Sequence, residues 1–335
     1  MEEVYPTPQS PAAVRCSGSR QLMGVPWIIT LYASDHPAGN QAIEAGLDEV
    51  ARLDGILSDY RPETELARLS AASPTAGPLP VSDELWEVLV RAVEFREGSD
   101  GAFDPTVGPL TTLWRQARRS GTLPIEEKLA AARSAVGRDL LKLVASPRGV
   151  HLTRPAMRLD LGGIGMGFAI DKVLRLLALR GITSALIDAS GDVGASGPPP
   201  ESDGWKVAID PIPGTPAATS GHVVLAHAAI TTSGDARQAV EIGGRRYSHV
   251  VDPRTGLGIP GPAAVTVIAP DATAADALAT AANVLGPVRG RTLLENQAGC
   301  AGRFVWIGGG NNAEVREVQT SRWPMAGTGV APLPG

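Results

Sequence analysis

The sequence predicts a mixed α/β (α+β) fold, because segments with the pattern of strands alternate with segments with the pattern of helices along most of the chain. Hydrophobic residues make up 43% of the 335 residues and charged residues 19%, which is a globular composition. Only 4% of the residues are aromatic, so aliphatic side chains and alanine have to fill the core. The length predicts one large domain or two closely packed ones.

Short apolar runs bounded by turn residues are expected to be the strands of this fold. The first of them follows Pro26, and the last precedes a long alanine-rich run. In chain order the predicted strands are 27–32, 140–144, 157–161, 184–188, 206–209, 223–226 and 265–268.

Helical periodicity predicts four helices between these strands. In 41–57 the apolar side chains recur at helical spacing, and a second helix begins after Ser82 and stops before Gly98. The third is 168–179, which Gly181 ends as a natural C-terminal cap, and the fourth is 274–285, which Gly286 closes.

The composition predicts where the domain begins and ends. Residues 1–21 are predicted to be a disordered or loosely attached tail, 22–310 the functional domain, and 311–335 a C-terminal strand and tail. The internal loops are expected at 70–80, 191–203 and 211–220, because these segments are rich in proline and glycine and lack apolar periodicity.

Charge and cysteine usage exclude several classes of protein. The net charge of −5 disfavours nucleic-acid binding, and the two distant cysteines, Cys16 and Cys300, disfavour a disulfide framework, a cysteine metal site and thiol catalysis. No apolar run reaches the roughly 20 residues that span a bilayer. The polar N-terminus lacks the apolar core of a signal peptide and predicts a cytoplasmic protein; an upstream segment missing from this sequence would make it periplasmic or membrane-anchored.

The segment 160–171 (DLGGIGMGFAID) combines a strand, a glycine-rich turn and a helix start. Glycines allow backbone to approach a phosphate, and a helix N-terminus presents free N–H groups to it. A tight strand-to-helix turn with no ligand explains the same pattern, and a glycine-rich turn alone favours that explanation. The spacing G-x-G-x-G does not match the dinucleotide-binding fingerprint.

Three further segments contain candidate chemistry. Asp276 and Thr280 are four residues apart on a predicted helix, where a carboxylate and a hydroxyl suit Mg²⁺ but also suit an ordinary surface or capping pair. His249 and Asp252 can move a proton near neutral pH, or His249 can make a structural hydrogen bond at a strand end. The segment 100–110 alone indicates only a turn before a helix.

Taken together, these segments resemble the FAD:protein FMN transferase (ApbE) family, in the same order and over approximately residues 23–307. The matching motifs are Met23-Gly24, SDYRP at 58–62 with Glu65-Leu66, FDPTVGPL at 103–110 with Trp114, SGD at 190–192, TSGD at 232–235, SHVVDPRTG at 248–256 and ADALAT at 275–280.

The resemblance implies layered sheets flanked by helices, related to the T-fold, with an FAD cleft between two subdomains. It implies Mg²⁺ ligation by Asp276, Thr280 and the backbone carbonyl of Gly163, and a reaction centre at His249 and Asp252. The positions that correspond to contacts with the flavin nucleotide are Met23, Tyr60, Ala102, Phe103, Asp104, Asp160, Met166, Asp192 and Val250.

The implied reaction cleaves the pyrophosphate of FAD, transfers FMN to a Thr or Ser hydroxyl of an acceptor protein and releases AMP. A magnesium-dependent FAD pyrophosphatase and a non-catalytic FAD-binding protein are the alternatives. The sequence departs from the family pattern at Met166, where many members have lysine. Arg237 or Arg254 is a candidate to replace that positive charge.

Overall fold

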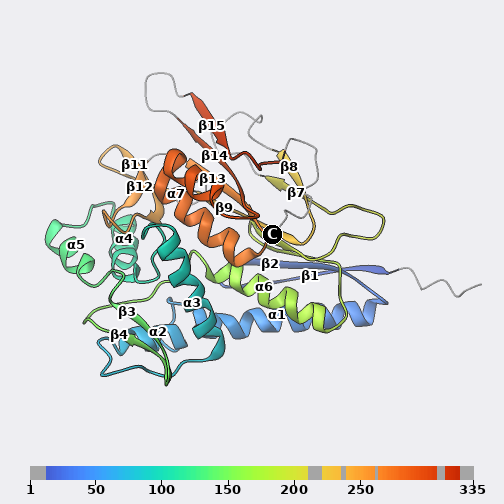
Figure 1. Cartoon of the computed structure of the whole chain (residues 1–335), viewed down its shortest axis with the longest axis horizontal. Helices are drawn as coiled ribbons and strands as arrows, with labels where there is room; N and C mark the ends of the chain where they lie inside the picture. The colour runs from blue at the N-terminus through green and yellow to red at the C-terminus, as the bar shows by residue number, and fades with distance from the viewer. Residues whose placement is uncertain (1–12, 210–220, 235–238, 261–262, 308–313, 325–335) are drawn as a thin grey trace, which may run out of the picture.

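The computed structural model describes residues 13–209, 221–234, 239–260, 263–307 and 314–324, and it confirms the mixed α/β class. Figure 1 shows strands in the centre of the molecule with long helices packed against them. No helix in these ranges is both long enough and apolar enough to cross a lipid bilayer.

The main sheet of the described chain has eight strands, and every neighbouring pair in it is antiparallel. In spatial order the strands are β1 (Val14–Leu22), β2 (Val25–Ala33), β5 (Ala185–Ala189), β6 (Asp192–Ala195), β9 (Ala228–Gly234), β13 (Ala263–Ala269), β14 (Ala301–Ile307) and β15 (Val315–Gln319).

Three long helices cover one face of this sheet: α1 (His36–Leu57), α6 (Gly165–Leu179) and α7 (Ala272–Glu295). Their apolar faces and the alternate side chains of the strands form the largest hydrophobic core. The pair β7 (Trp205–Ile209) and β8 (Gly221–Leu225) contributes Trp205 and Leu225 to a second cluster, on the other face of the sheet. The sheet is therefore covered on both faces.

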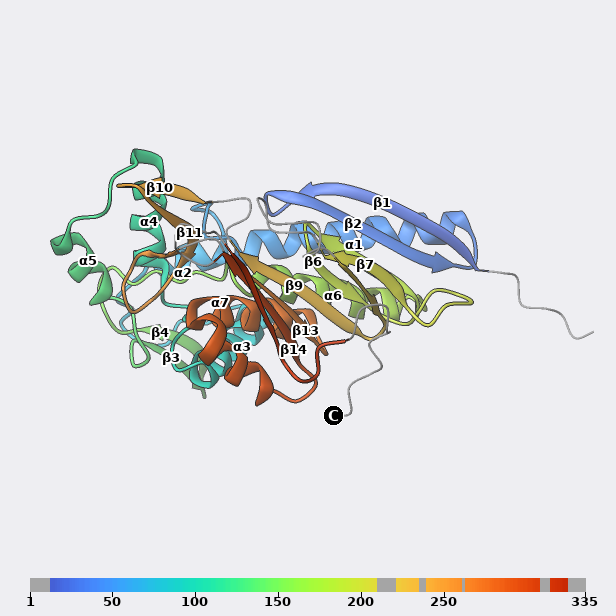
Figure 2. The same cartoon turned by 90° about the horizontal axis from the view of Figure 1, so that it is seen from above.

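A third hydrophobic cluster lies at one end of the molecule, around the buried Trp114. It is built from α4 (Gly108–Ser120), α5 (Glu126–Arg133) and the small sheet β10 (Val240–Ile242), β11 (Arg245–Val251) and β12 (Gly258–Pro260). Figure 2 shows α4, α5, β10 and β11 gathered at this end. The other elements are α2 (Glu65–Ala71), α3 (Asp83–Gly98), β3 (Leu141–Ala145) and β4 (Arg148–Leu152).

The four predicted helices are confirmed, and one of them ends later than predicted. Ser82 accepts a hydrogen bond from Leu85 N–H and so caps α3 as expected, and Gly181 follows α6 with φ of 80°. The fourth helix does not stop at Gly286: this residue, with φ of 74°, makes a kink before Pro287, and helix α7 continues to Glu295.

Two predictions about strands and loops are wrong. Segment 157–161 makes only an isolated bridge between Arg158 and Val107, because its N–H groups bond elsewhere: Leu159 to the Ser70 hydroxyl and Asp160 to the Pro105 carbonyl. The predicted loop 191–203 contains β6, whose four residues are all buried in the main sheet. The predicted loop 211–220 lies outside the described residues.

The N-terminal boundary also differs from the prediction, since residues 14–21 belong to β1 and not to a loose tail. β1 pairs with β2 along its whole length, and Met23-Gly24 forms the two-residue turn between them. Both turn residues have positive φ, 49° and 81°, as a type I′ hairpin turn requires. At the other end of the chain, β15 provides the expected C-terminal strand.

Candidate functional site

The glycine-rich turn before α6 packs directly against α7. A side chain at Gly163 would come within 2.8 Å of the Thr280 hydroxyl oxygen, so the two residues lie face to face. Gly167 N–H donates a 3.1 Å hydrogen bond to the Asp276 carboxylate. The fold therefore brings together the backbone of Gly163 and the side chains of Asp276 and Thr280, the three residues expected to hold a metal.

Buried carboxylates cluster around this contact. Burial raises the pKa of Asp276 well above its usual value, and the nearby charge of Asp192 raises it further. Burial likewise raises the pKa of Asp192 to about 7. Across the described chain neither carboxylate is in an ion pair, and a bound cation would favour the charged form of both.

These residues fit a magnesium ion that takes most of its ligands from substrate and water. Asp276 would supply one carboxylate, Thr280 a hydroxyl and Gly163 a backbone carbonyl, which are all hard oxygen donors. In the described part of the chain, His, Cys, Asp and Glu side chains form no group of three or more that could hold a metal without such help. The phosphates of a nucleotide would complete this coordination.

Asp171 and Asp271 fix the start of α7. Asp271 is the N-cap and accepts a 2.7 Å hydrogen bond from Ala274 N–H. Asp171, on α6, accepts hydrogen bonds from the N–H groups of Ala272 and Thr273, at 2.9 and 2.8 Å, and from the Thr273 hydroxyl. This contact sets the register of the two helices, and with it the position of Asp276 against the glycine-rich turn.

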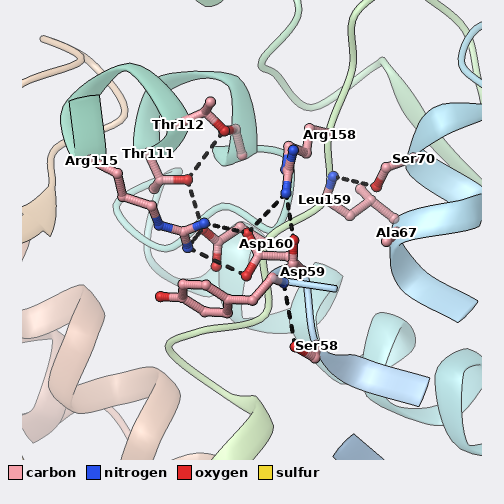
Figure 3. A network of polar contacts seen from close by, with 12 residues as sticks. Ser58, Asp59, Ala67, Ser70, Thr111, Thr112, Arg115, Arg158, Leu159 and Asp160 are labelled. Carbon is pink, nitrogen blue, oxygen red and sulfur yellow. Dashed lines mark hydrogen bonds and ion pairs between the residues drawn. The ribbon is translucent and has the colours of Figure 1, made fainter. Parts of the chain in front are cut away.

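A second polar network surrounds Asp160, which begins the glycine-rich segment (Figure 3). The buried Asp160 carboxylate accepts hydrogen bonds from Gly162 N–H at 2.8 Å, Thr111 Oγ1 at 2.7 Å and Arg115 Nη2 at 3.2 Å. Arg115 also donates a 2.6 Å hydrogen bond to the buried Asp59. Tyr60 is adjacent, with its ring 4.3 Å from the Arg115 guanidinium carbon.

Ala102 and Phe103, in the segment 102–104, belong to the main hydrophobic core. Ala102 and Phe103 are buried, and Phe103 packs edge-on against Phe95. The Asp104 carboxylate accepts hydrogen bonds from Thr106 N–H at 2.8 Å and its hydroxyl at 2.6 Å. Burial outweighs these two bonds and raises the pKa of Asp104.

The residues of the expected reaction centre lie on and just after β11. His249 is half-buried, and Val250 packs against the main core. Asp252 forms an ion pair with Arg254, at 2.8 Å between Nη2 and Oδ2, and Arg254 Nη2 also lies 3.4 Å from the Val284 carbonyl of α7. Arg254 is therefore engaged at the turn after β11, and Arg237 lies outside the described residues.

The structure adds residues that sequence analysis did not single out. Asn283 lies three residues after Thr280 on α7 and donates a 3.2 Å hydrogen bond to Ser233 Oγ in the TSGD segment. The sequence could have pointed to Asp59 and Arg115, because each is next to a residue of a recognised motif: Asp59 precedes Tyr60, and Arg115 follows Trp114. A single sequence does not indicate that these two residues pair with each other, because 56 positions separate them.

The chain is similar in sequence to proteins of a known family. Residues 23–304 match the model of the ApbE family. The chain is 32% identical over 299 residues to the FAD:protein FMN transferase of Klebsiella pneumoniae (strain 342), covering 87% of this chain and 84% of that protein. It is 33% identical over 295 residues to the FAD:protein FMN transferase of Treponema pallidum (strain Nichols), covering 82% and 80%.

Solved structures agree with the sequence comparison. The apo form of the Pseudomonas stutzeri flavinyl transferase ApbE superimposes with a TM-score of 0.81 at 31% identity, over 92% of this chain and 96% of that one. The flavin transferase ApbE from Vibrio cholerae gives a TM-score of 0.80 at 27% identity, over 92% and 98%.

Proposed function

The chain belongs to the ApbE family, and from this premise we propose that it is a magnesium-dependent FAD:protein FMN transferase. The reaction would cleave the pyrophosphate of FAD, join FMN to a Thr or Ser hydroxyl of an acceptor protein and release AMP. One observation carries the proposal: a buried carboxylate, a hydroxyl and a glycine-rich turn meet where α6 begins beside α7. This arrangement suits a metal ion held between protein and nucleotide phosphates.

Each residue near the metal has a distinct task in this proposal. Asp276 and Thr280 would hold the ion from α7, and Gly163 would offer its backbone carbonyl. When bound, magnesium neutralises phosphate charge and polarises the phosphorus toward attack. The start of α6, which includes Met166, would place free backbone N–H groups near the phosphates, and Asp192 would add negative charge that favours the ion.

The flavin half would lie toward the Asp160 network. Tyr60 offers an aromatic ring that is 76% exposed, and Asp160 offers a carboxylate already fixed by three donors. Met23 and the segment 102–104 would complete the contacts with the nucleotide. Val250 would approach from β11, beside the reaction centre.

The chemical step needs one proton to move. The acceptor hydroxyl oxygen would bond to the FMN phosphorus while the bond from that phosphorus to the bridging oxygen breaks, and AMP would leave with that oxygen. His249 would take the hydroxyl proton, an effect typically worth about 10² to 10⁴ in rate. Asp252 would hold the turn that carries Arg254 and so keep this end of β11 in place.

The test is to incubate the purified protein with FAD and Mg²⁺, with and without an acceptor domain that carries an exposed Thr or Ser. AMP release together with an FMN mass increment on the acceptor establishes the transferase. AMP and free FMN without an adduct would indicate a pyrophosphatase. FAD binding without AMP in either condition would indicate a binding protein and would contradict the proposal.

The metal assignment is tested at Asp276. We expect Asp276→Ala and the isosteric Asp276→Asn to lower Mg²⁺-dependent AMP release by at least about 100-fold, because charge stabilisation carries most of a phosphoryl-type transfer. Asp276→Asn removes a buried charge and keeps the shape, so its urea midpoint should equal or exceed that of the wild type. Retained magnesium-dependent release in either variant would refute the ligand assignment.

A further inference from the structure

Arg115 connects two buried carboxylates and one exposed aromatic ring. Its guanidinium donates a 2.6 Å hydrogen bond to Asp59 and a 3.2 Å hydrogen bond to Asp160, and the Tyr60 ring lies 4.3 Å from its central carbon. Figure 3 shows Arg115, Asp59 and Asp160 pointing toward one another from three separate segments. One planar cation therefore organises side chains that lie far apart in the sequence.

The backbone around Tyr60 is held independently of its ring. Arg158 donates a hydrogen bond to the Asp59 carbonyl, before Tyr60, and the Thr64 hydroxyl lies 3.0 Å from the Arg61 carbonyl, after it, so the loop between α1 and α2 is anchored on both sides of Tyr60. The ring itself is 76% exposed and lies against the guanidinium. The contact with Arg115 thus restrains the ring, while the loop restrains only the backbone.

We propose that Arg115 is a positioning residue, which holds the Tyr60 ring at a fixed orientation so that its outer face can stack on a planar ligand ring. The proposal rests on the proposed function, in which that ligand is the flavin of FAD. Stacking loses less rotamer freedom when the ring is already fixed in the free protein. Arg115 itself contributes by restraint and not by contact with the substrate.

Arginine is suited to this task for geometric reasons. Its planar guanidinium can stack on the ring while its edge donates to Asp59 and Asp160 at the same time. Lysine would keep the positive charge between the two buried carboxylates but offers no flat surface. Comparison of the two residues therefore separates charge balance, on which folding depends, from restraint of the ring.

The experiment is a double-mutant cycle read by equilibrium dialysis against FAD with EDTA present. We expect Arg115→Met and Tyr60→Ala each to raise the Kd for FAD about tenfold. Asp160 keeps its hydrogen bonds from Gly162 N–H and Thr111 Oγ1 when Arg115 is replaced, so the effect of Arg115 should pass through Tyr60, and the double variant should be no more than about twofold weaker than Tyr60→Ala. Arg303→Met is the matched control: it removes a buried arginine whose ion pair with Glu317 joins β14 to β15 at one edge of the main sheet, and it should leave the Kd unchanged.

Arg115→Met leaves two buried carboxylates facing each other, so Arg115→Lys is measured beside it. We expect Arg115→Lys to keep the urea midpoint near that of the wild type and still raise the Kd, and to raise KM for FAD in AMP release with little change in kcat. An unchanged Kd in Arg115→Lys, or independent multiplicative effects in the cycle, would overturn the positioning role. A wild-type protein that bound no FAD in EDTA and released no AMP from FAD with Mg²⁺ would instead refute the proposed function itself.

Discussion

At the scale of single residues, Met166 has the clearest consequence for activity. It is partly buried in the first turn of α6, next to Gly167, whose N–H bonds the Asp276 carboxylate. A lysine there would add a positive charge near the proposed phosphate position. We therefore expect Met166→Lys to lower the KM for FAD several-fold, as a single charge near a phosphate is worth about 1 kcal/mol. Steady-state AMP release measures this.

The control for this variant is Met166→Gln, which is polar and of similar length but carries no charge. A lysine at a helix N-terminus also opposes the helix dipole, by about 0.3 to 1 kcal/mol, so the urea midpoint should fall slightly in Met166→Lys alone. If Met166→Lys and Met166→Gln had equal KM values, charge at this position would have no effect on FAD.

Asp104 predicts a pH dependence of stability. Burial raises the pKa of Asp104 in the folded state, so the folded protein binds this proton more tightly than the unfolded chain does. The contribution of Asp104 to stability is therefore fully present below about pH 4 and is lost as the pH rises through the folded pKa. Asp104→Asn can accept the same bonds from Thr106 through its amide oxygen and does not titrate.

The measurement is the free energy of unfolding in urea from pH 4 to pH 8, for the wild type and Asp104→Asn. The difference between them should change in favour of the variant as the pH rises through the folded pKa of Asp104, and then level off. A difference that is constant over the whole range would show that Asp104 has the same pKa in both states.

Single-sequence reasoning found the residues that lie within motifs and missed those that act across the fold. The spacing of Asp276 and Thr280 on one helix suits an ordinary pair as well as a metal, and the family resemblance singled them out; the structure places both at the glycine-rich turn. The pairing of Arg115 with Asp59 depends on how two distant segments pack. The same holds for the contact between Asn283 and Ser233.

At the scale of elements, the close approach of α6 and α7 depends on Gly167. A Cβ at this position would overlap the carbonyl oxygen of Ala272 and would come within 2.9 Å of the Asp276 Cβ. Gly165, two residues earlier on the same helix, has room: its Cβ would meet only Leu161 Cβ, at 3.9 Å. The helices can therefore touch at Gly167, where the proposed metal ligand Asp276 lies.

We expect Gly167→Ala to destabilise the protein by about 1 to 3 kcal/mol, because backbone atoms have to move apart. Gly165→Ala should be neutral or stabilising by up to about 1 kcal/mol, since alanine favours helix over glycine. Urea unfolding of both variants measures the difference. Equal effects at the two glycines would show that α6 and α7 separate easily, and would remove the reason for the glycine at 167.

The wrong and missed predictions of strands share one reason: partners that are distant in the sequence decide whether a strand forms. The segment 157–161 has the composition of a strand, but its N–H groups are taken by Ser70 and Pro105, so no ladder forms. β6 and β1 were missed because glycine and polar residues hide strands that gain their stability from neighbours in the sheet. Helices were found more accurately, since their caps and periodicity are local.

At the scale of the whole molecule, the third hydrophobic cluster supports the proposed reaction centre on β11. Trp114 of α4 is buried in that cluster, and its Nε1–H donates a 2.9 Å hydrogen bond to the Ser248 carbonyl, directly before His249. Its ring also packs edge-on against Tyr247. Trp114 thus holds the middle of β11 against α4, in addition to the contact of Val250 with the main core.

We expect Trp114→Ala to loosen this end of the molecule selectively, because deletion of a buried tryptophan costs about 3 to 5 kcal/mol and the other core clusters remain filled. Hydrogen exchange followed by mass spectrometry should show faster exchange in β11, while the amides of α1 keep their protection. Trp114→Phe retains most of the packing and loses only the indole donor. The exchange rate of β11 in this variant should therefore lie between those of the wild type and Trp114→Ala. Uniformly faster exchange throughout the chain would mean that the molecule unfolds as one cooperative unit, and that β11 has no local freedom of its own for catalysis to use.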